Sequence, residues 1–151
     1  MAERGLRIRP FEARDQQAAR QLILNGLGGH FGFLDETLNP DLNDILRTYV
    51  EQGEIFLVAE DEEGNIVGTG ALVREAGGVG RIVRVSVESR QRRKGIGRAM
   101  VQRLLELARQ RGYHRVVLST NLGWDDAIGL YRSLGFSGYE RGGNMHMDLE
   151  L

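Results

Sequence analysis

Apolar residues recur at two different spacings along the chain, and these spacings predict an alternation of strands and helices. Leu6 to Arg9 alternates between apolar and polar residues, which predicts a short strand that ends at Pro10. From Glu12 to Leu27 the apolar residues recur at helical spacing. The segment 25–40 is rich in glycine and aromatic residues, which indicates a loop, and Leu42 to Val50 carries the apolar stripe of an amphipathic helix.

The middle of the chain predicts a hairpin and a further long strand. Ile55 to Glu60 and Ile66 to Val73 are apolar runs on either side of Asp61 to Asn65, which has the composition of a turn. Two glycines at 77–78 interrupt the chain again. The stretch Arg81 to Val87 (RIVRVSV) then alternates like a strand.

The last third of the chain continues the alternation. Its pattern predicts a helix beyond Gly97 that ends at Gly112, a buried strand at Val116–Leu118, a helix from Asp125 to Leu134, and closing strands at Tyr139 and Met145–Leu149. Strands and helices interleave, with hairpins in the middle and at the end. We therefore predict an α/β fold with a mixed sheet, formed as a single domain over residues 1–151.

Composition limits the chemistry that the chain can carry. A chain of 151 residues can bury about two-thirds of its unfolded surface without disulfides. It contains no cysteine, which excludes disulfides, thiolate metal sites and a cysteine nucleophile. The three histidines are scattered, so we expect no zinc or other metal site.

Charge and hydropathy limit the partners in the same way. The formal net charge is −1, whereas a broad nucleic-acid-binding surface usually comes with a high pI, so we expect no nucleic-acid partner. No apolar run reaches the length of a membrane span, and the N-terminal residues lack the hydrophobic segment of a secretory signal. We therefore expect a cytoplasmic protein with no membrane partner.

One short stretch, residues 87–100 (VESRQRRKGIGRAM), concentrates positive charge in front of two glycines. It lies between a predicted strand and a predicted helix. A helix begins with unpaired N–H groups and a partial positive charge, and glycines before it let several N–H groups converge on one anion. Arg92, Arg93, Lys94 and Arg98 add to the local field, so the stretch predicts a pyrophosphate site held mainly by backbone.

Three other interpretations of this stretch compete with the pyrophosphate site. A basic run by itself is usually a solvated face or a nucleic-acid patch. A dinucleotide-binding fold requires Gly-x-Gly-x-x-Gly after the first strand, and here the spacing and the position differ. A P-loop requires Gly-x-x-x-x-Gly-Lys-[Ser/Thr], which the chain lacks.

Two motifs together resemble the GNAT acetyltransferase superfamily. The segment 92–97 (RRKGIG), preceded by Val85-Ser86-Val87, is similar to that family's [Gln/Arg]-x-x-Gly-x-[Gly/Ala]. Downstream, 127–136 (AIGLYRSLGF) resembles its Ala-x-x-Leu-Tyr-x-x-x-Gly-Phe. The resemblance covers nearly the whole chain. It implies a mostly antiparallel central sheet with helices on both faces, splayed open between the strand that ends at Val87 and the next.

The resemblance also implies acetyl-CoA as cosubstrate. Its pyrophosphate would lie on the amides of residues 92–98, namely Arg92, Arg93, Lys94, Gly95, Ile96, Gly97 and Arg98. Its pantetheine arm would pair with the backbone of Val85, Ser86 and Val87. The amide of Val87 would then stabilise the oxyanion that forms at the thioester.

The chain departs from the family pattern at two positions. Many members carry Asn-x-x-Ala before the last helix, with the Asn on the cofactor arm, and here Trp124 occupies that place. Asn121, three residues earlier, is the alternative contact. A proline that is common two residues after the strand valine is replaced by Ser89.

Tyr131 is the candidate general acid. It shares one helical face with Ala127, Leu130 and Leu134, so its hydroxyl is carried toward the interior and requires a partner. With an ordinary pKa near 10 it is protonated at neutral pH and comparable to an alkyl thiol. It also counts among the candidate cofactor contacts.

The general base has several candidates. His30, in the glycine-rich segment that lines the acceptor side in the family, is the first, because an ordinary histidine titrates near neutral pH. The other candidates are Asp35, Glu36, Glu60 and Glu75, or a chain of water molecules. Arg84 and Ser86 should point away from the valines at 83, 85 and 87, either toward the acceptor or under a helix.

The resemblance predicts an N-acetyltransferase that moves acetyl to a primary amine by direct attack in a ternary complex. The acceptor stays open between small-molecule and peptide amines, and a homodimer through an edge strand is possible. One alternative is a non-catalytic acyl-CoA sensor of the same fold. The other is a nucleic-acid-binding protein that uses the 90–94 cluster, which a steep salt dependence of binding would reveal.

Overall fold

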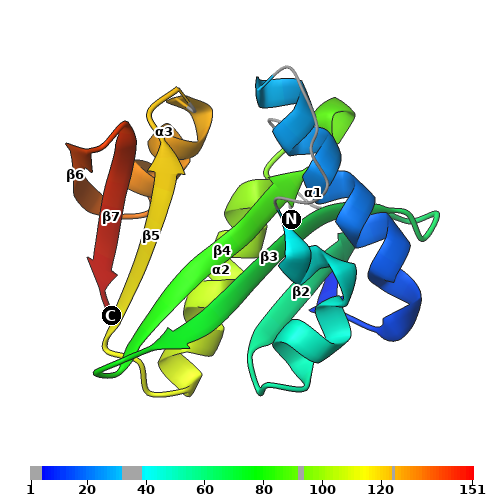
Figure 1. Cartoon of the computed structure of the whole chain (residues 1–151), viewed down its shortest axis with the longest axis horizontal. Helices are drawn as coiled ribbons and strands as arrows, with labels where there is room; N and C mark the ends of the chain where they lie inside the picture. The colour runs from blue at the N-terminus through cyan, green and yellow to red at the C-terminus, as the bar shows by residue number, and fades with distance from the viewer. Residues whose placement is uncertain (1–4, 32–38, 92–93, 124) are drawn as a thin grey trace.

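A single mixed sheet organises the protein. The computed structural model describes residues 5–31, 39–91, 94–123 and 125–151. Seven strands follow the order β1-β2-β3-β4-β5-β7-β6 across the sheet (Figure 1). Their bounds are β1 Arg7–Pro10, β2 Ile55–Glu60, β3 Ile66–Glu75, β4 Val79–Val87, β5 Arg115–Asn121, β6 Ser137–Arg141 and β7 Asn144–Glu150. Among the described strands only β4 and β5 pair in parallel, so the sheet is mixed and mostly antiparallel, as predicted.

Helices cover both faces of this sheet, and each face buries its own apolar cluster. Helix α1 (Gln16–Phe31) lies across β3 and β4 on one face (Figure 1). On the other face α2 (Ile96–Gln110) packs on β2, β3 and β4, and α3 (Asp125–Ser133) contributes Ile128 and Tyr131 to the same cluster. None of the described helices has both the length and the apolar composition that a membrane span requires.

The structure corrects two predicted elements on the α1 face. The predicted loop began at Asn25, but α1 continues to Phe31. Glycine lowers helix propensity without forbidding helical dihedrals, and Ile23 and Leu24, both fully buried, anchor the helix just before its glycines. The predicted helix over 42–50 is divided into a 3-10 turn at Pro40–Asn43 and a π-helical turn at Leu46–Val50.

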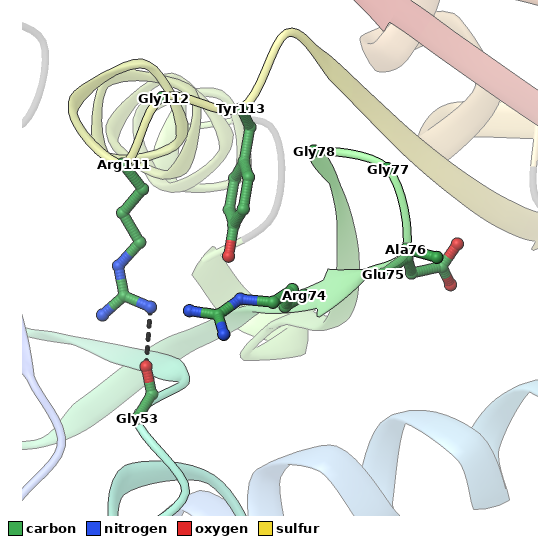
Figure 2. A pocket seen from close by; sticks show the side chains of 9 residues that line it. All are labelled: Gly53, Arg74, Glu75, Ala76, Gly77, Gly78, Arg111, Gly112 and Tyr113. Atoms are coloured by element: carbon green, nitrogen blue, oxygen red, sulfur yellow. Dashed lines mark hydrogen bonds between the residues drawn. The ribbon is translucent and has the colours of Figure 1, made fainter.

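A crevice of about 750 Å³ lies where the β3–β4 hairpin meets the end of α2. The ring of Tyr113 packs over Gly80, where an added Cβ would come within 2.8 Å of it. Figure 2 shows its hydroxyl directed between Arg74 and Arg111, and Arg111 donates instead to the carbonyl of Gly53 at 2.6 Å. The Tyr113 hydroxyl is buried and makes no hydrogen bond within the described part of the chain.

We expect Tyr113→Phe to leave the free energy of unfolding unchanged or to raise it by up to about 1 kcal/mol, because the variant removes a buried hydroxyl that lacks a partner. The matched change Tyr49→Phe should instead cost about 1–2 kcal/mol, since that hydroxyl donates to Asp41 at 2.6 Å. Urea unfolding of both variants measures the difference. A loss above 1 kcal/mol in Tyr113→Phe would show that its hydroxyl has a partner in solution.

Candidate functional site

The sheet opens between its two parallel strands. β4 and β5 pair only from Val79 to Arg81, opposite Arg115 to Val117. Beyond this point no described strand pairs with that edge of β4, and a cavity of about 990 Å³ occupies the gap. Its lining comes from β4, β5, α1, the first turn of α2, and α3. The predicted splay is therefore present.

The open edge of β4 presents free backbone donors to the cavity. The N–H of Glu88 donates to the carbonyl of Val67 on β3 at 2.9 Å. Successive N–H groups of a strand point to opposite edges, so the N–H groups of Val85 and Val87 point away from β3, toward the cavity. Both residues line the cavity, as does Ser86 between them.

A β-bulge at Arg84 changes the phase of β4. Thr69 pairs with Ser86 and Ala71 pairs with Val83, so the single residue Gly70 faces two residues of β4. Arg84 takes up the extra length with φ of 58°, a left-handed conformation that no other described non-glycine residue has.

Because of the bulge, the side chains of β4 do not alternate as the sequence predicted. Val83 packs into the cluster under α1, whereas Val85 and Val87 pack into the cluster under α2. The prediction that the valines share one face is therefore wrong for Val83. The extra residue at the bulge reverses which face each later side chain meets.

An ion pair holds Arg84 in this conformation. Its Nη2 and Nε donate to the two carboxylate oxygens of Asp41 at 2.6 and 3.0 Å, and both side chains are about four-fifths buried. Tyr49 donates to the same carboxylate, and the hydroxyl of Thr69 donates to the Arg84 carbonyl at 2.8 Å. The bulge is thus fixed through both its side chain and its backbone.

The electrostatics of this cluster follow from burial and hydrogen bonding. Burial works against both charges, yet the hydrogen bonds between them prevail, so the pKa of Asp41 lies below its usual value and the pKa of Arg84 lies above its own. Burial and the hydrogen bond to Asp41 raise the pKa of Tyr49 to about 12. All three groups keep their ordinary protonation state at neutral pH.

The first turn of α2 supplies a second set of free donors. Gly95 precedes the helix in a left-handed conformation with φ of 87°, and the first helical bond runs from Ala99 N–H to its carbonyl at 3.0 Å. The N–H groups of Ile96, Gly97 and Arg98 therefore have no partner within the helix, and all three residues line the cavity.

The basic side chains around this turn differ in position. Arg98 lines the cavity and donates to the hydroxyl of Ser133 on α3. Lys94 is exposed. Arg92 and Arg93 lie outside the described residues, so their predicted part in the site stays a prediction.

Tyr131 reaches the cavity from α3. It is 6% exposed, and its ring meets Phe136 edge-on at a centroid distance of 5.6 Å. Burial raises its pKa to about 12, above the value near 10 that the sequence suggested. The phenol therefore stays protonated at all ordinary pH values and acts more readily as a hydrogen-bond donor than as a source of a fully transferred proton.

Two of the carboxylate candidates for a general base, Glu60 and Glu75, do not line the cavity. Glu60 accepts from Arg9 at 3.1 Å at the end of β2, and Glu75 is paired with Arg81 at the end of β3. Both carboxylates are thus engaged in ion pairs elsewhere on the sheet. Asp35, Glu36 and the side chain of His30 lie outside the described part of the chain.

Asn121, the alternative cofactor contact in the loop between β5 and α3, makes a local hydrogen bond in the structure. The Asn121 side chain accepts from the N–H of Gly123 at 2.8 Å, which closes a turn, and Asn121 is not among the residues that line the cavity. Its cofactor contact stays a prediction, and Trp124 lies outside the described residues. No group of three potential metal ligands occurs within the described residues.

Two residues of the site were not singled out from the sequence. Ser119 on β5 lines the cavity, and His146 on β7 lies beside it, with 3.0 Å between the serine Oγ and the histidine Nδ1. The pair forms because β5 and β7 are neighbours with Ser119 opposite His146. A prediction of the register between β5 and β7 would have brought the two residues together, but no local motif marks either residue.

Comparison with known proteins agrees with the fold and the motifs. The model of the acetyltransferase (GNAT) family matches residues 13–136, so this chain belongs to that family. It is similar to a structure of a GNAT-family acetyltransferase from Staphylococcus aureus Mu50, with a TM-score of 0.89 and 22% identity over 97% of this chain and 99% of that one. It also resembles the PaiA N-acetyltransferase of Thermoplasma acidophilum in complex with coenzyme A, with a TM-score of 0.81 and 16% identity over 97% and 99% of the two chains.

Among curated proteins the chain is similar to human N-acetyltransferase 8, with 38% identity over 111 residues. The match covers 69% of this chain and 48% of the relative. The chain thus spans about half the length of the curated relatives it matches.

We expect Arg84→Ala to lower the free energy of unfolding by about 2 kcal/mol at pH 7, because it leaves the Asp41 carboxylate buried without its cation. In the parent protein the lowered pKa of Asp41 adds stability that is complete above the ordinary carboxyl pKa and is lost as pH falls through the lowered value. Without Arg84 the pKa of Asp41 rises, so acid unfolding should begin at higher pH.

Urea unfolding between pH 3 and pH 7 measures both effects. Arg103→Ala is the matched control, because Arg103 pairs with Glu106 on the exposed side of α2, and it should change stability by less than about 0.5 kcal/mol. Equal losses in the two variants would contradict a structural role for the Arg84 ion pair.

Proposed function

We propose that this chain is an N-acetyltransferase that moves acetyl from acetyl-CoA to a primary amine by direct attack in a ternary complex. The observation that carries the proposal is the cavity in which two sets of unpaired backbone donors meet, the open edge of β4 and the first turn of α2. Family membership supports the same reaction class.

The residues present fit acetyl-CoA. Unpaired N–H groups at a helix start favour a pyrophosphate, and Gly95 leaves the backbone there open to a close approach. An extended arm carrying amides can pair with the free edge of β4 at Val85 and Val87, as a further strand would. The guanidinium of Arg98 adds positive charge beside the pyrophosphate position.

The protein's part in the reaction is positioning and charge stabilisation. Acetyl-CoA supplies the activated acyl group when bound. The N–H of Val87 is a fixed donor for the oxygen on which negative charge develops. Tyr131 donates a hydrogen bond toward the departing sulfur, a role for which its raised pKa keeps the proton in place.

We expect Gly95→Ala to weaken binding of coenzyme A at least tenfold. A Cβ at φ of 87° costs about 1–2 kcal/mol and moves the turn that presents the N–H groups. Gly112→Ala is the matched control, since Gly112 follows the other end of α2 with φ of 79° and should lose similar stability with no loss of affinity. Calorimetry with coenzyme A measures both variants. Equal affinity for coenzyme A in the two variants would place the pyrophosphate elsewhere.

A panel of amines tests the activity itself. Small amines, amino acids and short peptides are each offered with acetyl-CoA, and release of coenzyme A is followed. With an active acceptor, Tyr131→Phe should lower kcat about a hundredfold and leave the affinity for coenzyme A unchanged, because the hydroxyl acts on the leaving group.

The pH dependence of the same assay is a second check. Because the pKa of Tyr131 is about 12, its ionisation should cause no loss of rate below about pH 10. Tight binding of coenzyme A without turnover of any amine would instead favour a non-catalytic acyl-CoA sensor.

A further inference from the structure

Ser119 connects the cavity to a histidine on the open half of the sheet. The serine lines the cavity, and its Oγ lies 3.0 Å from Nδ1 of His146. The phenol ring of Tyr139 stacks on the imidazole with centroids 5.5 Å apart and planes 24° apart. One face of His146 is thus supported by an aromatic ring, while its Nδ1 is directed at the serine.

The two ends of the cavity lie on different faces of the sheet. Leu118 packs under α2, and Ser119, the next residue on β5, therefore faces the α1 side. Ile23 and Gly26 of α1 line the cavity with Ser119, whereas Tyr131 lines it from the α2 and α3 side. A base on one face and a proton donor on the other is the arrangement that an attacking amine and a departing thiolate require.

Charged side chains near His146 come from several strands of the sheet. On β4, Arg81 approaches the Ser119 Oγ at 3.4 Å while its guanidinium is paired with Glu75. On the same face of β7 and β6 lie Asp148, which is paired with Arg115 at 2.6 Å, and Arg141. Glu75 and Asp148 are therefore each paired with an arginine, and among the described side chains Ser119 is the polar group bonded to Nδ1.

We propose that Ser119 and His146 form a proton relay that deprotonates the acceptor amine, with Ser119 in contact with the amine and His146 acting through it. This inference rests on the proposed function and names the base that function needs. It also gives a role to His146, a residue for which the sequence motifs assign none.

The relay conserves protons and electrons. Ser119 Oγ takes the extra proton of the protonated acceptor amine and passes its own proton to Nδ1 of His146. The neutral amine then forms the C–N bond at the thioester carbon and releases a second proton to solvent. Tyr131 donates a hydrogen bond to sulfur as the C–S bond breaks, and the sulfur keeps the electron pair of that bond and takes a proton from solvent. His146 then returns its proton to solvent.

An experiment independent of the acceptor uses a single thiol. The chain contains no cysteine, so Ser119→Cys introduces one. A thiol bonded to an imidazole has a lowered pKa, and iodoacetamide should alkylate it about tenfold faster at pH 7 than in the double variant Ser119→Cys with His146→Asn. Asparagine keeps a hydrogen-bond acceptor near the position of Nδ1 but cannot take up the proton.

Protection by coenzyme A tests whether the introduced thiol lies in the cavity. At saturation, coenzyme A should slow alkylation of the introduced thiol if it lies in the same cavity. Thr48→Cys, on the exposed surface of the π-helical turn, is the matched control, and neither coenzyme A nor His146→Asn should change its rate. Equal alkylation of Ser119→Cys with and without His146, or no protection while calorimetry shows coenzyme A bound, would overturn the relay.

Kinetics with an acceptor from the amine panel test the catalytic step. His146→Asn and Ser119→Ala should each lower kcat at least tenfold at pH 7, with KM for acetyl-CoA unchanged. The deficit should shrink as pH approaches the pKa of the acceptor amine, because the amine then arrives without its extra proton.

His114→Asn is the matched control for the kinetics. Its ring nitrogen also makes a hydrogen bond, to the carbonyl of Gly77 at 2.7 Å, but far from the cavity, so kcat should not change. An unaltered pH profile in folded His146→Asn and Ser119→Ala would contradict the relay. Failure of coenzyme A to bind the parent protein would instead refute the proposed function, and the alkylation rates would still report on the Ser119–His146 contact.

Discussion

The structure depends on the ion pair between Arg84 and Asp41, because it stabilises the one left-handed non-glycine residue of the described chain in the middle of a central strand. The bulge at Arg84 shifts the side chains that follow it, so that Val85 and Val87 pack under α2. Beyond the short pairing with β5, the N–H groups of these valines are left without a strand to bond. Burial of the ion pair beside Tyr49 makes this arrangement costly to undo, since either charge alone would be left desolvated.

The cavity draws its chemical groups from both faces of the sheet. Backbone donors come from β4 and from the start of α2, where no side chain is needed to bind an anion. Side-chain donors and acceptors come from β5, β7 and α3, where Ser119, His146 and Tyr131 lie. A site built mainly from main-chain amides also explains how a chain with a net charge of −1 can favour a polyanionic ligand.

The parts of the fold and site that the sequence predicted are those that depend on local pattern. The helix after Gly97, the hairpin around Asp61–Asn65 and the inward face that carries Tyr131 follow from spacing alone. The bulge at Arg84 was missed because RIVRVSV alternates as a regular strand, and the extra residue is visible only against the register of β3. The contact of Ser119 with His146 joins residues 27 positions apart through strand order, and the pKa of Tyr131 depends on burial, so neither can be derived from a motif.

The narrow connection between β4 and β5, three residue pairs long, has a consequence for how the family can diversify. Residues up to Gln110 provide the backbone donors, and residues from Arg115 onward provide the serine, the histidine and the tyrosine. Because so few pairs join the two portions, substitutions in the later portion can alter the side chains that line the cavity while the earlier portion stays intact. Chain order thus divides the cavity between an earlier portion that supplies backbone donors and a later portion that supplies side chains.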